Sequence, residues 1–295
     1  MTARILDGKA IAMKVRAEVA KGVALFTQAH GRPPGLEVIL VGDDPASQVY
    51  LKKKQEACVE AGITVERAGF PAGTGTDEVV RRVRQLGADP SVHGILVQLP
   101  LAAPAEGSAV LDAVPPAKDV DGFHPENAGR LALGLPGFIP ATPFGVLRLL
   151  QHYEIPLSGR HAVVLGRSAI VGRPLATLLS SKPHDMTVTI GHSASGPLLR
   201  SLAREADLLV AAVGKRHMVT ADWVKPGAVV VDVGIHREQG GNGKNRLTGD
   251  VEFESVRHVA GAITPVPGGV GPMTVAIVVL STVIAAERQS ATVKV

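Results

Sequence analysis

Cysteine and aromatic residues are scarce in this sequence, and their scarcity excludes several kinds of site. The single cysteine of the 295-residue chain, Cys58, cannot form an internal disulfide bond and leaves no cysteine cluster for zinc or iron–sulfur. Aromatic residues make up 3% of the chain and are not interleaved with the basic clusters at 52–54 and 81–82, so base stacking with nucleic acid is not expected. We expect a protein of a reducing compartment, most simply the cytoplasm, that binds no nucleic acid.

The sequence also lacks a long uninterrupted apolar run and a block of charge of one sign. Charged residues interrupt the first 15 residues, unlike the core of a signal peptide. The most apolar run, 273–286, contains hydroxyl side chains and is short for a membrane span. The formal net charge is +4, and the basic residues are scattered among acidic ones. These features predict no membrane segment and leave an anionic small molecule open as a ligand.

Glycine and proline are abundant instead, with 33 and 21 residues, and they separate short strand-like and helical segments. The alternation of β-branched runs with longer helical patterns is typical of βαβ units and a mostly parallel sheet. The expected strands are 36–41, 63–68, 94–98, 161–165, 187–190, 208–213, 228–233 and 262–265. The expected helices are 10–26, 46–61, 76–86, 142–152, 172–179 and 197–205, with a last apolar helix from about Pro272. The sequence therefore predicts an α/β fold with eight strands in two sheets.

One region rich in glycine and proline, 115–143, has little periodicity and separates the first three strands from the last five. It marks the expected boundary between two α/β domains. We predict a first domain over 1–140, completed by the C-terminal helix at about 272–295, and a second domain over 141–271. The polar segment 238–245 is expected to be an exposed hairpin loop.

The second domain begins with a strand, a glycine turn and a helix start, around Gly166, Arg167, Ser168 and Gly172. Glycines let a phosphate approach the backbone, and the N-terminus of a helix supplies free N–H groups and the positive end of the helix dipole. Ser168 stands where the usual G-x-G-x-x-G pattern has its second glycine, so a plain tight turn remains open. The segment is a candidate nucleotide site in a Rossmann-like domain.

The end of the next strand bears on which dinucleotide would bind. A cofactor without a 2′-phosphate is usually held there by an acidic residue, but strand 187–190 is followed by Gly191, His192 and Ser193. Arg167 lies close to the glycine turn. Hydroxyl and guanidinium groups suit an anionic 2′-phosphate, so NADP is favoured over NAD.

In the first domain, Tyr50 and Lys54 lie four residues apart on one face of the helix that follows strand 36–41. Open α/β sheets bind ligands at such strand ends. A lysine whose charge is discouraged by burial can act as an acid or base, and a neighbouring phenol can stack or relay a proton. An exposed surface pair is the alternative interpretation.

Three further segments carry polar or rigid residues that a ligand could contact. Gln98 follows an apolar strand and either satisfies the backbone or faces a ligand. Asp119 and Asp121 lie in a loop with glycine and proline, where turn formation and function are both open. His124 has no partner with metal-ligand spacing, so no metal site is assigned. The loop 265–272 leads from a strand into the last helix, and its glycine and proline content favours a ligand-lining loop.

Taken together and in this order, these motifs resemble the bifunctional methylenetetrahydrofolate dehydrogenase/methenyltetrahydrofolate cyclohydrolase family. The resemblance covers nearly the whole chain, and the most diagnostic segment is Pro265-Val-Pro-Gly-Gly-Val-Gly-Pro272. The other segments that carry it are 41–54, 94–101, 118–124, 166–172, 225–227, 232–235 and 249–251.

The resemblance implies two reactions in one cleft between the two domains. NADP⁺ would accept a hydride from the one-carbon bridge of 5,10-methylenetetrahydrofolate, and hydrolysis of the methenyl product would give 10-formyltetrahydrofolate. Hydride transfer needs alignment of the two carbons and no base. The resemblance further implies a cytoplasmic homodimer that serves one-carbon metabolism and purine biosynthesis.

The resemblance also implies roles for individual residues. Lys54 would be the main catalytic residue, assisting water addition and ring opening. Gln98 would hydrogen-bond Lys54, while Tyr50 would stack on the folate ring system and Asp121 would hold the pterin. The remaining folate contacts would be Ser47, Leu99, Pro100, Pro265 and Gly269. The dinucleotide contacts would be Gly166, Arg167, Ser168, Ser193 and Ile235.

Two segments depart from the family pattern. The usual Cys-His-Ser-x-Thr is Gly191-His-Ser-Ala-Ser195 here, with alanine where a basic residue is frequent, which bears on the tightness of 2′-phosphate binding. The usual Asn-Thr of the last helix is Ser281-Thr282, without a predicted consequence. The altered 191–195 segment motivates an alternative function, another NADP-linked dehydrogenase with a different substrate.

Overall fold

The computed structural model describes residues 2–239 and 245–292, and it leaves the side chains of 45–47, 49, 50, 239, 245 and 292 outside its description. The chain divides into two compact units. We call them the three-stranded unit, residues 13–141 and 275–295, and the six-stranded unit, residues 1–12 and 142–274. Two long helices, α1 (Gly8–His30) and α10 (Val270–Thr292), contribute residues to both units.

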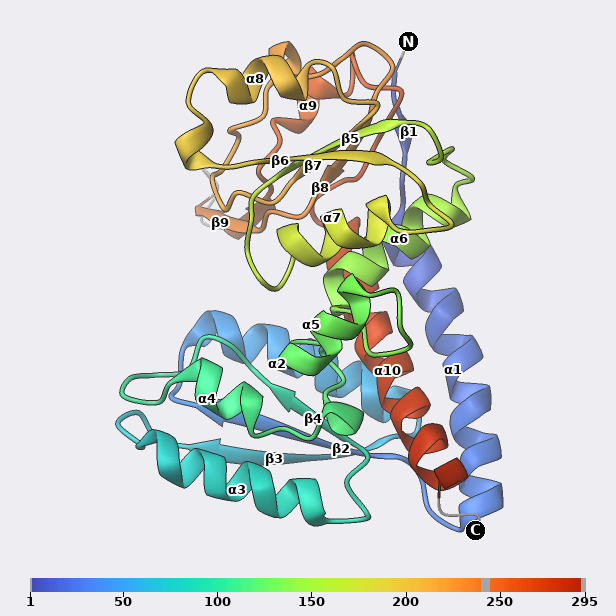
Figure 1. The fold of residues 1–295 in the computed structure, drawn as a ribbon, viewed down its shortest axis with the longest axis vertical. Helices are drawn as coiled ribbons and strands as arrows, with labels where there is room; N and C mark the ends of the chain where they lie inside the picture. Colours follow the sequence, from blue (N-terminus) through green and yellow to red (C-terminus); the bar gives the residue numbers. More distant parts are fainter. Residues whose placement is uncertain (1, 240–244, 293–295) are drawn as a thin grey trace. The chain divides into compact units, whose positions relative to one another are not determined.

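The three-stranded unit is built on a parallel sheet. Its strands are β2 (Gly35–Val41), β3 (Thr64–Phe70) and β4 (Gly94–Val97), in the order β3-β2-β4. Helix α2 (Pro45–Glu60) connects β2 to β3, and α3 (Thr76–Ala88) connects β3 to β4. Figure 1 shows these two helices on opposite sides of the sheet. After β4 come the short helices α4 (Gly107–Asp112), η1 (Pro116–Lys118) and α5 (Pro125–Ala132).

Apolar side chains of this sheet bury against α3 and α4. Ile39 and Ile95 on the strands are 0% and 1% exposed, and they belong to one cluster with Val79 and Val83 of α3 and Val110 of α4. Val79 and Val83 are four residues apart and therefore lie on one face of α3, which is the face that packs against the sheet. The packing fixes the carboxyl ends of β2 and β4, where the candidate site residues follow.

The six-stranded unit holds a larger parallel sheet, in the order β1-β11-β8-β7-β5-β6. Its strands are β1 (Arg4–Ile5), β5 (His161–Leu165), β6 (Thr187–Gly191), β7 (Leu208–Ala211), β8 (Val229–Asp232) and β11 (Ala262–Ile263). Helices α6 (Ala141–His152) and α7 (Gly172–Ser180) pack on one face, and α8 (Leu198–Ala203) and α9 (Phe253–Val256) pack on the other. Two short helices, η2 (Ser193–Ser195) and η3 (Ala221–Trp223), lie in its loops.

The expected eight strands all occur in the structure, three in one sheet and five in the other. The N-terminus differs from expectation, because Arg4 and Ile5 pair with Ala262 and Ile263 and place residues 1–12 in the six-stranded unit. A two-residue strand is too short to leave a periodic signal. The expected hairpin loop is flanked by β9 (His236–Gln239) and β10 (Asn245–Thr248), and its residues 240–244 lie outside the described part.

The last helix begins at Val270, two residues before the predicted start at about Pro272. Helix α10 has 23 residues and, by length and composition alone, could cross a membrane. However, 67% of its apolar stretch is buried inside the protein, and residues from Met273 to Ala286 are buried on successive turns. Burial on all sides is the ordinary reason for a helix without a polar face. Packing therefore accounts for its composition.

Candidate active site

A buried ion pair marks the candidate site of the three-stranded unit. Lys54 lies on α2 and is 8% exposed, and Asp121 follows η1 and is 4% exposed. Lys54 Nζ and Asp121 Oδ1 are 3.8 Å apart. Burial raises the pKa of the Asp121 carboxyl, the charge of Lys54 opposes this rise, and the charge of Asp119 adds to it. The pair can hold or move a proton out of contact with bulk water, and the exposed-pair interpretation is wrong for Lys54.

Gln98 lies directly after β4 and leaves one polar atom unused. Its Nε2 donates to the carbonyl of Leu99 at 2.9 Å, whereas its Oε1 is buried and has no hydrogen-bond partner among the described residues. The predicted hydrogen bond to Lys54 is therefore not formed in this structure, because an ammonium group can only donate and the sole side-chain acceptor of Gln98 is unpaired. A buried acceptor without a partner costs about 1–3 kcal/mol, so Oε1 is placed to accept from a ligand.

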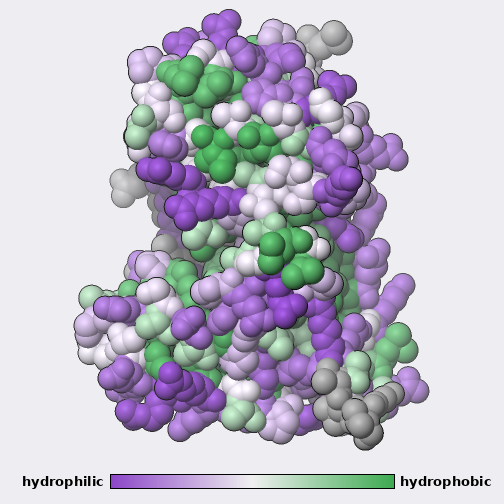
Figure 2. All heavy atoms as spheres, viewed as in Figure 1, coloured by the Kyte–Doolittle hydropathy of each residue, from purple (hydrophilic) through white to green (hydrophobic). Residues whose placement is uncertain are grey.

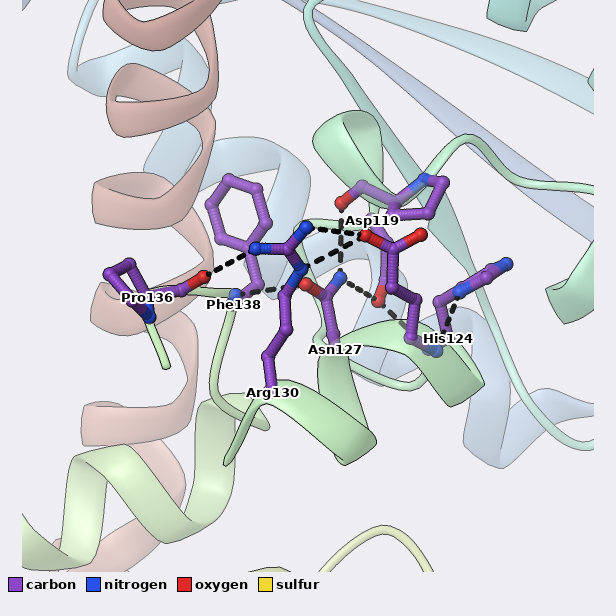
Figure 3. Close-up of polar contacts among 8 residues, drawn as sticks. Asp119, His124, Asn127, Arg130, Pro136 and Phe138 are labelled. Carbon is purple, nitrogen blue, oxygen red and sulfur yellow. Dashed lines mark hydrogen bonds and ion pairs between the residues drawn. The ribbon is translucent and has the colours of Figure 1, made fainter. Parts of the chain in front are cut away.

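Asp119 lies two residues before Asp121, and its carboxylate is fully used by the surrounding loop. Its Oδ1 accepts from Phe123 N at 3.1 Å, and its Oδ2 accepts from His124 N at 2.8 Å and from Asn127 Nδ2 at 2.9 Å. Figure 3 shows Asp119 and Asn127 facing one another. Of the two carboxylates in the motif, Asp119 forms the turn, and Asp121 is left for the site.

Asn127 on α5 joins this loop to the segment after the helix. Its side chain is buried, with 2% exposed, and its Oδ1 accepts from Phe138 N at 3.2 Å. Arg130 donates to the carbonyl of Pro136 at 3.2 Å one turn later (Figure 3). His124 Nδ1 accepts from Glu126 N and so caps α5. The hydrogen bonds hold the loop that carries Asp121.

Two glycine positions in the turn after β5 have no room for a Cβ atom. Gly166 follows β5 with φ of 115°, and a Cβ atom there would overlap the carbonyl oxygen of Ala212. A Cβ atom on Gly172, the first residue of α7, would overlap the carbonyl oxygen of Gly166. Ser168 Oγ accepts from Val171 N at 3.2 Å. The backbone turn and the N-terminus of α7 thus form a surface that a diphosphate fits, with exposed Arg167 beside it.

The altered segment after β6 keeps the form of a capped turn. His192 N donates to Ser195 Oγ at 3.1 Å, and His192 Nδ1 accepts from Ala194 N. Serine thus supplies the hydroxyl at the position where the family pattern has threonine. At Gly191, a Cβ atom would overlap the buried side chain of Leu199. Leu199 fills the space, so packing accounts for glycine at position 191.

The remaining predicted residues of this unit lie in loops at strand ends. Ile235 follows β8, and its side chain is 39% exposed. Pro265 follows β11, and its carbonyl accepts from Gly269 N at 2.8 Å. Gly268 between them has φ of 115°. Pro265 and Gly269 therefore belong to one tight turn at the start of α10.

The predicted residues divide between the two units of the structure. Lys54, Gln98, Leu99, Pro100 and Asp121 belong to the three-stranded unit, as do Ser47 and Tyr50, whose side chains lie outside the described part. Gly166, Arg167, Ser168, Ser193, Ile235, Pro265 and Gly269 belong to the six-stranded unit. Among the described residues no group of three or more His, Cys, Asp or Glu side chains could hold a metal ion.

Sequence reasoning missed three buried polar residues that shape these loops: Asn127, Asp232 and Asp250. Asp232 and Asp250 stand in motifs that carry the family resemblance, Asp-Val-Gly-Ile and Gly-Asp-Val, but no role was expected for either. Asn127 follows Asp119 by eight residues and gives no periodic signal. In each case, the signal lies in contacts that only the fold creates.

Comparisons with known proteins agree on one family. A model of tetrahydrofolate dehydrogenase/cyclohydrolase, catalytic domain, matches residues 6–121, and a model of the NAD(P)-binding domain of the same family matches residues 140–290. The bifunctional protein FolD of Parvibaculum lavamentivorans is 54% identical over 293 residues, which cover 98% of this chain and 97% of the relative. The bifunctional protein FolD of Paracidovorax citrulli is 51% identical over 288 residues, covering 98% and 99%.

Solved structures give the same result. The bifunctional enzyme FolD, methylenetetrahydrofolate dehydrogenase/cyclohydrolase, from Campylobacter jejuni has a TM-score of 0.91 at 44% identity, over 97% of this chain and 99% of that chain. The methylenetetrahydrofolate dehydrogenase-cyclohydrolase of Trypanosoma brucei, solved with NADP cofactor and inhibitor, has a TM-score of 0.92 at 36% identity over 100% of both chains.

Proposed function

Because the chain belongs to the tetrahydrofolate dehydrogenase/cyclohydrolase family, we propose that it oxidises 5,10-methylenetetrahydrofolate with NADP⁺ and hydrolyses the methenyl product to 10-formyltetrahydrofolate. The observation that carries this proposal is the buried pair of Lys54 and Asp121, 3.8 Å apart. A buried acid–base pair suits a reaction in which water is added and protons are moved. Overall, the hydrolysis consumes one water molecule and releases one proton.

The three-stranded unit would bind the folate and carry out the hydrolysis. As the ring opens, the Lys54 ammonium gives a proton to the ring nitrogen and takes one back from the hydroxyl group that the added water has formed, while the other proton of the water is released. Asp121 accepts hydrogen bonds from the pterin, and its charge keeps Lys54 oriented. Gln98 Oε1, which has no partner in the described part of the chain, accepts from the substrate or from water. Tyr50 stacks on the ring system, and Ser47, Leu99 and Pro100 complete this part of the site.

The six-stranded unit would bind the dinucleotide. Gly166 and Gly172 leave the backbone open to the diphosphate, and their missing Cβ atoms are the observation that fits this group. Arg167 and Ser193 are exposed and suit the 2′-phosphate. NADP⁺, when bound, supplies the acceptor for the hydride. Pro265 and Gly269 would shape the folate wall from this unit.

The proposal includes a cytoplasmic homodimer in one-carbon metabolism and purine biosynthesis, without a membrane or nucleic-acid partner. Exposed apolar side chains on the edge strand β6 and on helix α8 support the dimer: Ile190 on β6 is 39% exposed and Leu198 on α8 is 59% exposed. Figure 2 shows apolar surface over these two elements. Sedimentation equilibrium of the full chain and of an Ile190→Asp, Leu198→Asp variant would test the dimer, since the variant is expected to be monomeric.

One assay tests the two reactions separately. Purified protein is mixed with methylenetetrahydrofolate and either NADP⁺ or NAD⁺, and formation of the reduced cofactor is followed by absorbance. Hydrolysis is followed by the loss of methenyltetrahydrofolate absorbance without cofactor. We expect both reactions, with NADP⁺ preferred. Binding of NADP⁺ without turnover of either folate would contradict the proposed function and support the alternative dehydrogenase.

A further inference from the structure

Two buried carboxylates join the loops at the carboxyl ends of β7 and β8 in the six-stranded unit. Asp232, the last residue of β8, is 3% exposed, and Asp250, which follows β10, is fully buried. Parallel α/β sheets bind ligands at this edge. The residues that these two side chains hold are therefore candidates for cofactor contact.

Asp250 connects three separate segments. Its Oδ2 accepts from Val213 N at 2.7 Å and from Gly214 N at 3.0 Å, the two successive amides of the loop after β7. Its Oδ1 lies 2.8 Å from His236 Nε2, at the start of β9. The Asp250 carboxylate therefore accepts hydrogen bonds from two backbone N–H groups and one imidazole N–H group.

Asp232 fixes the neighbouring turn in the same way. Its Oδ1 accepts from Gly234 N and Asp250 N, both at 2.9 Å, and its Oδ2 accepts from Val251 N at 3.0 Å. Gly234 also lies against Asp250, so closely that a Cβ atom on Gly234 would overlap the Asp250 carboxylate. The two aspartates and the turn after β8 thus form one packed group.

Ile235 lies between the two anchors. Gly234 before it donates to Asp232, and His236 after it is bonded to Asp250. The residues on both sides of Ile235 are therefore held, Gly234 by its backbone and His236 by its side chain, while the apolar side chain of Ile235 stays 39% exposed at the ligand-binding edge. An exposed apolar side chain on a rigid backbone can present a fixed surface to a flat ring.

We infer that Asp250, acting through His236, is a positioning residue that holds Ile235 against the bound dinucleotide. The inference rests on the proposed function, in which Ile235 contacts the cofactor. His236 is the better residue to change, because its side chain is 22% exposed and its removal leaves the backbone bonds of Asp250 in place. Asp250 itself is fully buried, so its removal would also test stability.

The experiment compares three variants of the full chain. His236→Ala removes the donor to Asp250, His236→Gln restores a donor of similar reach, and His258→Ala removes an exposed histidine of the same unit as a matched control. NADP⁺ affinity is measured by calorimetric titration without folate, together with the KM for NADP⁺, the cyclohydrolase rate and the unfolding temperature. Affinity measured without folate separates this inference from the proposed folate chemistry.

We expect His236→Ala to weaken NADP⁺ binding on the order of tenfold and to raise the KM for NADP⁺, with the cyclohydrolase rate and unfolding temperature unchanged. His236→Gln and His258→Ala are expected to bind as the wild type does. Wild-type affinity in His236→Ala would overturn the inference. A His236→Ala variant whose cyclohydrolase rate and unfolding temperature fall together with its NADP⁺ affinity would also overturn the inference, because it would show a purely structural role.

A double-mutant cycle tests whether His236 acts through Ile235. If it does, adding His236→Ala to an Ile235→Ala variant weakens NADP⁺ binding much less than the same change does in the wild type. Fully additive losses would overturn the inference, since they would place the effect of His236 elsewhere.

Discussion

The two units bury aspartates to the same extent but use them differently. Asp121 of the three-stranded unit is 4% exposed, and Asp232 of the six-stranded unit is 3% exposed. Among the described residues, Asp121 is paired with Lys54 at 3.8 Å, whereas Asp232 accepts from three backbone N–H groups. The carboxylate of Asp232 is occupied by these backbone donors, whereas the carboxylate of Asp121 can still accept hydrogen bonds from a ligand. The partners of a buried carboxylate, rather than its burial, therefore indicate whether it is available for chemistry.

The same contrast extends to the way each unit meets its ligand. The three-stranded unit offers side chains, with the charge of Lys54 and an acceptor of Gln98 that has no partner among the described side chains. The six-stranded unit offers backbone, made accessible by glycines that have no room for a Cβ atom. Substitutions should therefore affect chemistry in one unit and cofactor affinity in the other.

The largest effect is expected for Lys54→Met. Methionine keeps the length of the side chain but removes its proton transfers and leaves Asp121 buried without its charged partner. We expect the cyclohydrolase rate to fall roughly 10²- to 10⁴-fold, with NADP⁺ affinity unchanged. Lys52→Met, at an exposed position of the same helix, is the control. An unaffected cyclohydrolase rate would show that Lys54 takes no part in the reaction, and the three-stranded unit would then no longer be the unit that acts through its side chains.

Gly172→Ala should give the opposite pattern. The new Cβ atom would overlap the carbonyl oxygen of Gly166, so the turn must open and the diphosphate surface changes. We expect NADP⁺ affinity to fall roughly tenfold or more, while hydrolysis of methenyltetrahydrofolate continues. Gly129→Ala is the control, because a Cβ atom there meets open space. Equal affinity in both variants would show that the turn does not bind the diphosphate.

The strands and the glycine turn could be predicted from the sequence because their signals are local. Apolar runs such as 36–41 and 161–165 contain enough residues to show a strand in the sequence itself. Strand β1 and helix α5 could not be predicted in this way. Strand β1 has two residues, and α5 has eight with one largely buried side chain, Asn127.

The sequence allowed the candidate residues of the site to be named, but not the hydrogen bonds and ion pairs between them. Gln98 ends a predicted strand, and Lys54 lies on the predicted helix that follows another strand, so both are near strand ends, where ligands are expected. Asp121 lies in the region of little periodicity that follows the third strand. The pairing of Lys54 with Asp121 rather than Gln98 depends on distances between elements that are not adjacent in the sequence. The role of Asp250 also depends on residues more than 30 positions away.

A smaller effect is expected for Asn127→Ala. The change removes the donor to Asp119 and to the Pro116 carbonyl, so the loop that carries Asp121 loses both of these hydrogen bonds. It also removes the acceptor for Phe138 N. We expect the free energy of unfolding to fall by about 1–3 kcal/mol and both folate reactions to slow several-fold. NADP⁺ affinity should not change, because the six-stranded unit is untouched.

Arg130→Ala is the matched control for Asn127→Ala. It removes a half-exposed side chain of the same helix, with its bonds to Glu126 and to the Pro136 carbonyl. We expect wild-type folate rates, measured with the same assays, and little change in denaturant unfolding. A control that slows the reactions as much as Asn127→Ala would show that the helix as a whole, rather than the bond to Asp119, matters for Asp121.

Glu37 offers a third case, a buried carboxylate without a proposed chemical role. It lies on the central strand β2 and is 5% exposed, with Oε1 4.0 Å from Arg82 and Oε2 without a hydrogen-bond partner among the described residues. Burial is the main cause of a raised pKa for Glu37, and the nearby charge of Glu66 adds to it. Neither an ion pair at close range nor backbone donors compensate this group.

The smallest effect is therefore expected for Glu37→Gln, and it should depend on pH. Because the pKa of Glu37 is raised in the folded state, its contribution to stability is present below the unfolded-state pKa and is lost as the pH rises through the folded-state value. Glutamine does not titrate, so the variant should gain on the wild type by less than about 1 kcal/mol between mildly acidic and mildly alkaline pH. Urea unfolding at both ends of that range measures the difference, with exposed Glu78→Gln as the control. A pH-independent difference would mean that the Arg82 charge already compensates Glu37, and this carboxylate would then belong with the satisfied aspartates of the six-stranded unit.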